Sequence, residues 1–331
     1  MCKINNKIAI SLLLTSFALL NACAGGENSG VLGDDKEKDA SATATWESIS
    51  SLDRSNSRPY SSVWAISDSN VLVAGPNGGV ITLSNGQYSQ STNVGTGSYL
   101  NTIWGSDDNN VYAGSELGRL PHFDGTGWRV QNVDAGGGYS YVYGIWGSSA
   151  SDIFLVGANG FITNYNGKVF SNVGKITYYD LQAVWGTGHD NVYAAGGDAG
   201  QAVIIHYDGV SWEIVHTDPT GGPFTSIWGS ASDDVYAVGT GGRIVHFDGD
   251  NWAVIETDVV SRGTWLSGIW GFARNDVYMV GYLADGLIYH FDGTEWALVH
   301  TEAAANFSAV YGTAEGQVYA VGSKVVRYAK R

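Results

Sequence analysis

The sequence predicts an all-β fold, a seven-bladed β-propeller with four antiparallel strands in each blade. Three observations lead to this prediction: a motif that recurs about every 40 residues, four short β-like runs in each copy, and chain ends that complement each other. The aromatic residue of an Ile-Trp-Gly-like step marks each copy, and successive markers lie 40, 42, 39, 43, 42 and 41 residues apart. The seven markers are Trp64, Trp104, Trp146, Trp185, Trp228, Trp270 and Tyr311.

The fifth copy shows the four runs most clearly. Residues 224–229, 234–239, 242–249 and 251–257 are rich in Val, Ile, Tyr, Phe and Trp, which favour strands. Gly, Asp, Asn and Ser separate the runs. The Asp248-Gly249 pair between the third and fourth runs suits the positive φ of a tight hairpin. Each copy is therefore expected to form one four-stranded sheet.

The first strand of each copy carries a fixed pattern of side-chain size. Residues two before the marker are all small, as crowding near the central axis demands, namely Ser62, Thr102, Gly144, Ala183, Ser226, Gly268 and Ala309. Residues four before the marker are large and apolar, namely Tyr60, Leu100, Val142, Leu181, Phe224, Leu266 and Phe307. A four-stranded sheet buries both faces only by stacking on its neighbours, so we expect these larger side chains to pack between blades.

The two ends of the chain complement each other. Residues 44–50 match fourth strands elsewhere, such as residues 211–217, yet no first three strands precede them. The seventh copy has strand patterns at residues 307–312, 317–322 and 324–328 and lacks a fourth. We predict that residues 44–50 complete the C-terminal blade and close the ring, which removes the exposed edges of an open array. The propeller then spans residues 44–331.

The first 22 residues have the features of a signal peptide. Two lysines precede an apolar run, residues 8–20, that is too short to span a membrane. The next step, Leu20-Asn21-Ala22-Cys23, resembles a bacterial lipobox, and this resemblance implies cleavage before Cys23 and lipid, such as palmitate, on its thiol. Ala24 follows in place of Asp, which in enterobacterial-type sorting implies the outer membrane. The alternative is an ordinary signal peptide with an incidental cysteine.

Composition narrows the classes of partner. Residues 23–43 are rich in Gly, Ser, Ala and charge, so we expect a lipid anchor followed by a disordered tether. The chain has 32 acidic and 17 basic residues, a formal net charge of −15. An acidic surface disfavours nucleic acid as a partner. The cysteines are Cys2 and Cys23 alone, so the predicted mature domain has no disulfide.

The sequence predicts no metal site, no cofactor and no enzymatic activity. Metal ligands lie about 2.0–2.1 Å from their ion, and residues at one repeat position of different blades lie too far apart for that. Asp- and Asn-rich turns lack the spacing of an EF-hand-type calcium loop. No catalytic or nucleotide-binding motif is present. Four histidines share one repeat position and are interpreted as structural: His122, His206, His246 and His290.

The candidate binding residues are aromatic side chains in the loops that precede first strands. In a propeller these loops gather on one face around the central opening. Aromatic rings there stack on sugar rings or anchor a protein partner. Packing between adjacent blades is the alternative. The candidates are Tyr99, Tyr139, Tyr141, Tyr178, Tyr179 and Trp265.

The repeat, clearest at residues 227–249, resembles those of bacterial secreted and lipoprotein β-propellers. It is more distantly similar to photosystem II assembly-factor-like and BNR propeller repeats, although the adjacent Asp248 and Gly249 depart from Asp-box spacing. The resemblance implies a propeller fold and a binding or assembly role. We expect a non-enzymatic scaffold, lipid-anchored at the outer membrane, that binds another envelope protein. The alternatives are a lectin-like propeller that binds surface glycans and, more remotely, a glycan-cleaving enzyme.

Overall fold

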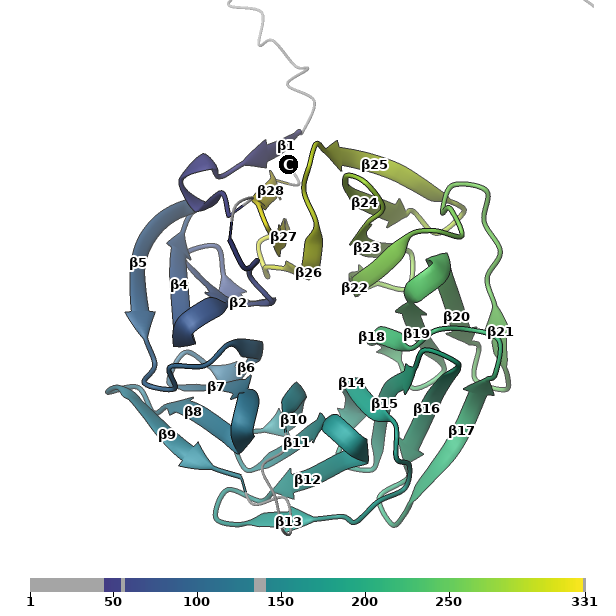
Figure 1. Ribbon diagram of the computed structural model, residues 1–331, viewed down its shortest axis with the longest axis horizontal. Helices are drawn as coiled ribbons and strands as arrows, with labels where there is room; N and C mark the ends of the chain where they lie inside the picture. The colour runs from purple at the N-terminus through teal and green to yellow at the C-terminus, as the bar shows by residue number, and fades with distance from the viewer. Residues whose placement is uncertain (1–44, 55–56, 134–140, 330–331) are drawn as a thin grey trace, which may run out of the picture. The chain divides into compact units, whose positions relative to one another are not determined.

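Seven four-stranded antiparallel sheets surround a central axis, and the chain passes through them in order (Figure 1). The computed structural model describes residues 45–54, 57–133 and 141–329. The predicted signal peptide (1–22), the tether (23–43) with Cys23, and the candidate Tyr139 lie outside the described residues. The predicted all-β propeller, with seven blades of four strands, is confirmed.

The strands of each blade follow one another from the axis outward (Figure 1). Blades one to three contain β2 (Ser62–Ser67), β3 (Asn70–Ala74), β4 (Gly79–Ser84), β5 (Gln87–Asn93); β6 (Leu100–Asp107), β7 (Asn110–Ser115), β8 (Arg119–Phe123), β9 (Trp128–Asn132); and β10 (Val142–Ser149), β11 (Asp152–Gly157), β12 (Phe161–Tyr165), β13 (Phe170–Asn172). Blades four to six contain β14 (Asp180–Gly188), β15 (Asn191–Asp198), β16 (Gln201–Tyr207), β17 (Trp212–Asp218); β18 (Phe224–Ala231), β19 (Asp234–Gly239), β20 (Arg243–Phe247), β21 (Trp252–Val254); and β22 (Trp265–Ala273), β23 (Asp276–Tyr282), β24 (Gly286–Phe291), β25 (Trp296–Glu302). Blade seven contains β26 (Phe307–Gly312), β27 (Gln317–Gly322), β28 (Val325–Ala329) and β1 (Trp46–Ser48).

The helices of the described residues are short 3₁₀ turns. They are η1 (Ser50–Leu52), η2 (Pro76–Gly78), η3 (Glu116–Gly118), η4 (Ala158–Gly160) and η5 (Thr240–Gly242). Across residues 45–54, 57–133 and 141–329, no helix has the length and apolar character needed to cross a membrane.

The N-terminal strand closes the ring, as predicted. β1 pairs antiparallel with β28, with Trp46 opposite Tyr328 and Ser48 opposite Val326. The Trp46 ring also meets Tyr278 of blade six edge to face at 6.3 Å between centroids. Equivalent edge-to-face contacts join Trp212 to Phe154, Trp252 to Tyr193, and Trp296 to Tyr236, at 6.1, 6.1 and 6.4 Å. Trp46 therefore fills the repeat position of a fourth-strand tryptophan in blade seven.

Polar contacts reinforce the junction between blades seven and one. Arg327 of β28 donates from one terminal nitrogen to Glu47 Oε2 at 2.7 Å and from the other to the carbonyl oxygen of Asn85 at 2.9 Å. At the same junction, Asp68 in the β2–β3 turn of blade one accepts hydrogen bonds from Thr313 Oγ1 and Gln317 Nε2 of blade seven. These contacts tie residues far apart in sequence across the closure.

The size pattern of the first strands has the predicted structural meaning. Residues four before the marker are buried and lie in clusters that join adjacent blades. At the small position, a Cβ added to Gly144 would lie 3.1 Å from the Cα of Ala183 in the next blade, and one added to Gly268 would lie 3.1 Å from the Cα of Ala309. Neighbouring inner strands thus approach through their backbones.

The glycines of the Asp-Gly pairs have the predicted positive φ, 99° at Gly249, but the hairpin that contains them is longer than a two-residue turn. In blade five the loop has four residues, and the Asp248 backbone N–H donates to the carbonyl of Asn251 at 3.3 Å. The Asp248 side chain accepts the N–H groups of Asp250 and Asn251 at 3.0 and 2.8 Å, so Asp serves as a cap. The two-residue turn occurs in blade one, at Asn85-Gly86, where φ is 51° and 75°.

Candidate binding site at the mouth of the central channel

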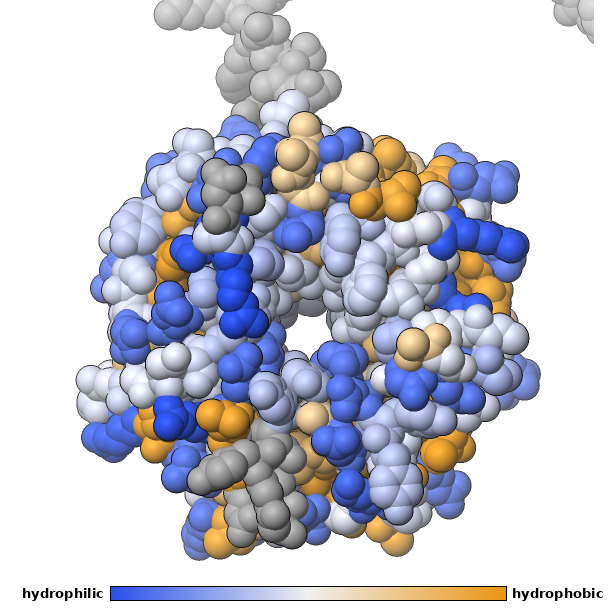
Figure 2. All heavy atoms as spheres, in the orientation of Figure 1, coloured by the Kyte–Doolittle hydropathy of each residue, from blue (hydrophilic) through white to orange (hydrophobic). Residues whose placement is uncertain are grey.

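The first strands of the seven blades enclose a central channel, which is open in the space-filling view (Figure 2). The cavity volume is about 840 Å³. Each first strand begins near one end of the channel, here called the mouth, and the marker residues lie deeper along the same strands. The mouth is therefore bordered by the loops that precede first strands, where the sequence places the candidate aromatic residues.

An uncharged polar ring forms the wall just inside the mouth. Its members stand three residues before each marker, and β-strand alternation turns them away from the buried neighbours on either side. Ser61 Oγ donates to the carbonyl of Leu100 at 2.5 Å, and Thr225 Oγ1 donates to the carbonyl of Leu266 at 2.6 Å, so this ring also links adjacent blades. The members are Ser61, Asn101, Tyr143, Gln182, Thr225, Ser267 and Ser308.

Four of the predicted candidates line the same cavity: Tyr99, Tyr178, Tyr179 and Trp265. Tyr99 is tied into the junction between blades one and two, because its hydroxyl donates to the carbonyl of Pro59 at 2.8 Å. The Arg58 guanidinium lies 4.0 Å from the centroid of the Tyr99 ring. Burial raises the pKa of the Tyr99 hydroxyl, and the nearby Arg58 charge opposes this effect.

Tyr178 and Trp265 are the exposed candidates of the mouth. Tyr178 is 81% exposed, and the Lys175 ammonium lies 5.2 Å from its ring centroid. Trp265 is 44% exposed and stacks on Tyr282 with centroids 6.2 Å apart and planes 12° apart. One face of the indole is thereby supported, and much of the remainder faces solvent. Supported aromatic side chains of this kind suit ligand contacts, because little side-chain freedom is lost on binding.

Tyr141 does not line the cavity with the other candidates. It is 38% exposed and its ring lies 6.1 Å from that of Tyr143. Tyr141 itself therefore does not line the channel, whereas Tyr143, two residues later, does. Tyr139 lies outside the described residues.

Sequence reasoning missed the residues of the polar ring, Tyr143 among them, and the two carboxylates that line the cavity, Asp180 and Asp198. Tyr143 belongs to the polar ring, and the regular occurrence of polar residues three before each marker is a signal that would have found it. Burial raises the pKa of the Tyr143 hydroxyl, and the nearby negative charge of Asp180 adds to the increase. Asp180 and Asp198 carry no repeat signal: Asp180 accepts a backbone N–H from Asn159 of blade three, and Asp198 accepts one from Gly200 of its own blade.

The repeated histidines have a structural role at the outer part of the blades. Each imidazole stacks on a second-strand tyrosine, with centroids 4.1–4.4 Å apart. Each Nε2 is 2.7 Å from a side-chain oxygen of the first residue of the second strand: Asn110, Asn191, Asp234 and Asp276. Among the described residues, no group of three or more His, Cys, Asp or Glu is placed to hold a metal ion.

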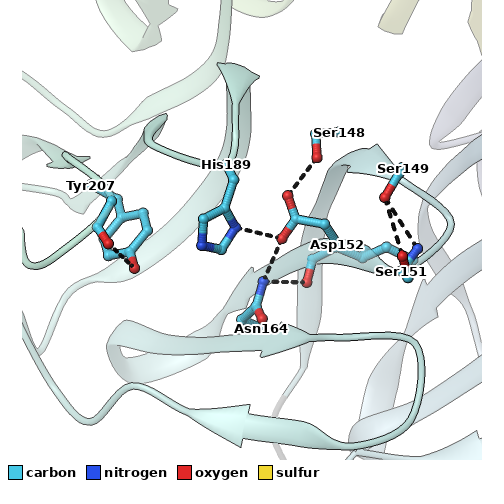
Figure 3. A network of polar contacts seen from close by, with 9 residues as sticks. Ser148, Ser149, Ser151, Asp152, Asn164, His189 and Tyr207 are labelled. Atoms are coloured by element: carbon cyan, nitrogen blue, oxygen red, sulfur yellow. Dashed lines mark hydrogen bonds and ion pairs between the residues drawn. The ribbon is translucent and has the colours of Figure 1, made fainter.

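Blade three replaces its own histidine with one from the next blade. Asn164 stands at the histidine position, and its Nδ2 donates to Asp152 Oδ1 at 3.2 Å. His189, from the β14–β15 turn of blade four, places Nδ1 2.7 Å from the same oxygen (Figure 3). Ser148 Oγ donates to Asp152 Oδ2 at 2.5 Å. The cluster therefore joins two blades through one carboxylate.

Comparison with known proteins identifies the fold. No family model and no curated protein matches the chain. Among solved structures, YCF48 bound to D1 peptide has a TM-score of 0.68 and 14% identity, over 87% of this chain and 95% of that chain. YCF48 from Cyanidioschyzon merolae has a TM-score of 0.67 and 11% identity, over 86% and 99%. The WD40 repeats of RRP9 have a TM-score of 0.68 and 12% identity, over 88% and 98%. The chain is thus similar in fold to YCF48 and to WD40 propellers.

Proposed function

We propose that the protein is a non-enzymatic binding module of the cell envelope that holds a partner protein at the mouth of its central channel. The observation that carries the proposal is the meeting of exposed aromatic side chains, Tyr178 and Trp265, at one end of an 840 Å³ cavity. Tyrosine and tryptophan contribute a large share of binding energy in protein interfaces. The fold supports the same role, since YCF48, a propeller with similar architecture, has been solved with a D1 peptide bound.

Crosslinking in intact cells, followed by purification of the protein, tests this function. The wild-type chain is compared with a Tyr178→Ala/Trp265→Ala variant and with Tyr88→Ala, which removes a 47% exposed aromatic ring from the outer strand β5. A specific partner should be crosslinked by the wild type and by Tyr88→Ala, and lost with the double variant. Equal recovery of the partner with all three proteins would place the interface away from the mouth.

The proposed anchor is a lipid on Cys23 that holds the propeller at the outer membrane. The lipobox-like step at residues 20–23 supports this location, and two or more acyl chains anchor a protein stably. Labelling with a palmitate analogue should modify the wild type and not a Cys23→Ser variant. Membrane fractionation should then place the wild type with outer-membrane markers and release the variant. A labelled variant, or a wild type in the inner-membrane fraction, would contradict the assignment.

A glycan is the second candidate ligand, favoured by the uncharged hydroxyl and amide groups of the polar ring beneath the aromatic mouth. Sugars combine such hydrogen-bonding groups with faces that stack on aromatic rings. A glycan array probed with the mature Cys23→Ser chain, and with the same chain carrying Trp265→Ala, tests this candidate. Binding that is lost with the Trp265 substitution would support a lectin, whereas a negative array leaves the protein partner as the ligand.

A further inference from the structure

The mouth of the channel is chemically uneven around its circumference. On the side formed by blades three and four, three tyrosine rings and two carboxylates border the cavity together. We call this group the acidic tyrosine cluster: Tyr143, Tyr178, Tyr179, Asp180 and Asp198. The opposite side contributes Trp265, Ser267 and Ser308, which carry no charge.

The only charged residues that line the cavity, among the residues described, are Asp180 and Asp198. Asp180 Oδ1 accepts the backbone N–H of Asn159 at 2.8 Å, and Asp198 Oδ1 accepts that of Gly200 at 2.9 Å. The second oxygen of each carboxylate takes part in neither bond. Backbone contacts thus orient both carboxylates at the mouth of the channel.

Two aromatic rings at the mouth already make cation–π contacts with basic side chains of the same chain. The Lys175 ammonium is 5.2 Å from the Tyr178 centroid, and the Arg58 guanidinium is 4.0 Å from that of Tyr99. Both distances fall within the range of about 6 Å at which a ring quadrupole attracts a cation. Arg58 is in addition 3.9 Å from Glu116, whereas Tyr178 remains 81% exposed. The ring of Tyr178 therefore has surface left for a second cation.

The net charge of the whole chain also favours a cationic ligand. A formal net charge of −15 produces a field that attracts cationic ligands and repels anionic ones, and a cleft lined by one sign of charge concentrates that field. Neutral ligands gain nothing from this field. The nearby Lys175 and Arg58 offset part of it, and both are engaged with rings of the mouth.

From this juxtaposition we infer that the acidic tyrosine cluster receives a lysine or arginine side chain of the partner. The inference rests on the proposed function and deepens it, because it names the chemical group that the mouth recognises. The cationic group lies against the tyrosine rings and pairs with Asp180 and Asp198, while the flanking polypeptide lies over the uncharged ring of the channel wall.

Binding of Nα-acetyl-lysine amide to the mature protein, followed by saturation-transfer NMR, tests the inference. The control ligand is the same compound acetylated on Nε, which keeps the chain and loses the charge. We expect the charged ligand to bind at least fivefold more tightly. Equal binding of the two ligands, or tighter binding of the acetylated one, would overturn the inference.

Two protein variants separate local recognition from the general field. Asp180→Asn/Asp198→Asn should weaken binding of the charged ligand at least fivefold. Asp250→Asn/Glu295→Gln removes the same charge from exposed hairpins of blades five and six and should leave binding within about twofold of wild type. Tyr178→Leu, at an exposed ring outside the core, should also weaken binding. An equal loss in the two charge variants would reduce the effect to net charge and overturn the inference.

The same variants distinguish failure of this inference from failure of the proposed function. If Asp180→Asn/Asp198→Asn still captures the crosslinked partner as wild type does, the partner binds without the acidic tyrosine cluster and only the inference fails. If lysine amide binds selectively and no partner is captured, the ligand chemistry stands and the proposed function fails.

Discussion

The indole ring of Trp228 lies against Gly271 of the next blade, and a Cβ on Gly271 would sit 2.7 Å from Cη2 of that ring. The same relationship joins Trp64 to Gly105, Trp104 to Gly147, Trp146 to Gly186, Trp185 to Gly229 and Trp270 to Gly312. At the closing junction the smaller Tyr311 packs in the cluster of Ala65. The Trp and Gly of the repeat therefore make a contact between neighbouring blades. The glycine of one blade leaves room for the tryptophan ring of the blade before it.

Replacing Gly271 with alanine should destabilise the propeller by about 1–3 kcal/mol, because the added methyl group meets both the Trp228 ring and the carbonyl of Asp276. Urea unfolding followed by tryptophan fluorescence measures the change. Gly127→Ala is the matched control, since a Cβ there meets no atom within 4 Å. An unchanged unfolding midpoint for Gly271→Ala would show that the ring moves aside without cost.

Loss of the contacts made by the closing strand, β1, should lower the stability of the whole propeller. Trp46→Ala deletes the contacts with Tyr328 and Tyr278 and should lower the free energy of unfolding by about 2–3 kcal/mol, below the range for a fully buried ring. Deletion of residues 44–50 should lower the melting temperature further and promote self-association, because the edge of β28 becomes free. Calorimetry and size-exclusion chromatography measure both effects. A monomeric deletion variant with a wild-type melting curve would contradict closure by this strand.

Side chains at the hairpins between first and second strands join adjacent blades. Asn70 Nδ2 donates to Asp108 at 2.5 Å, and Arg274 donates to Asp233 at 2.9 Å. Asn70→Asp should place two carboxylates together and destabilise the chain by about 0.5–1 kcal/mol, as expected for exposed charges. The double variant Asn70→Asp/Asp108→Asn should recover most of the loss in a double-mutant cycle. Additive effects of the two substitutions would show that the residues do not interact.

Acidification should destabilise the propeller through His122 and His206. Burial lowers the pKa of both imidazoles below the ordinary value of about 6.5, so near that pH the unfolded chain binds more protons than the folded one. Their contribution to stability is present above pH about 6.5 and is lost as the pH falls toward the lowered folded-state pKa. Urea midpoints at a series of pH values measure this effect.

The matched variant for the pH series is His206→Asn, which copies the residue of blade three at the same position. It should reduce the loss of stability between pH 7.5 and 5.5 relative to wild type. A pH dependence as steep as that of the wild type would assign the effect to other groups.

Local pattern accounts for much of the fold and less of the candidate site. The repeat predicts the blades because every copy must satisfy the same packing. Residues 44–50 are recognisable as a fourth strand because Trp46 occupies the position of the tryptophan that begins fourth strands in other blades. The positive φ of Gly249 was predicted correctly, but an Asp-Gly pair does not distinguish the four-residue loop that Asp248 caps from a two-residue turn. Tyr141 and Tyr143 show the limit at the site: two residues apart, only the second lines the channel.

The sequence by itself determined the number of blades, the strands within them and the closure of the ring, because those features follow from periodicity and from a missing fourth strand. The repeat also predicts that Tyr178 and Trp265 come to one face of the ring, because the loops before first strands gather around the axis. Only the tertiary structure decided that Asp180 and Asp198 border the cavity beside Tyr143, since these carboxylates lie in positions without a repeat pattern. Their placement depends on contacts within and between blades, which no local pattern encodes.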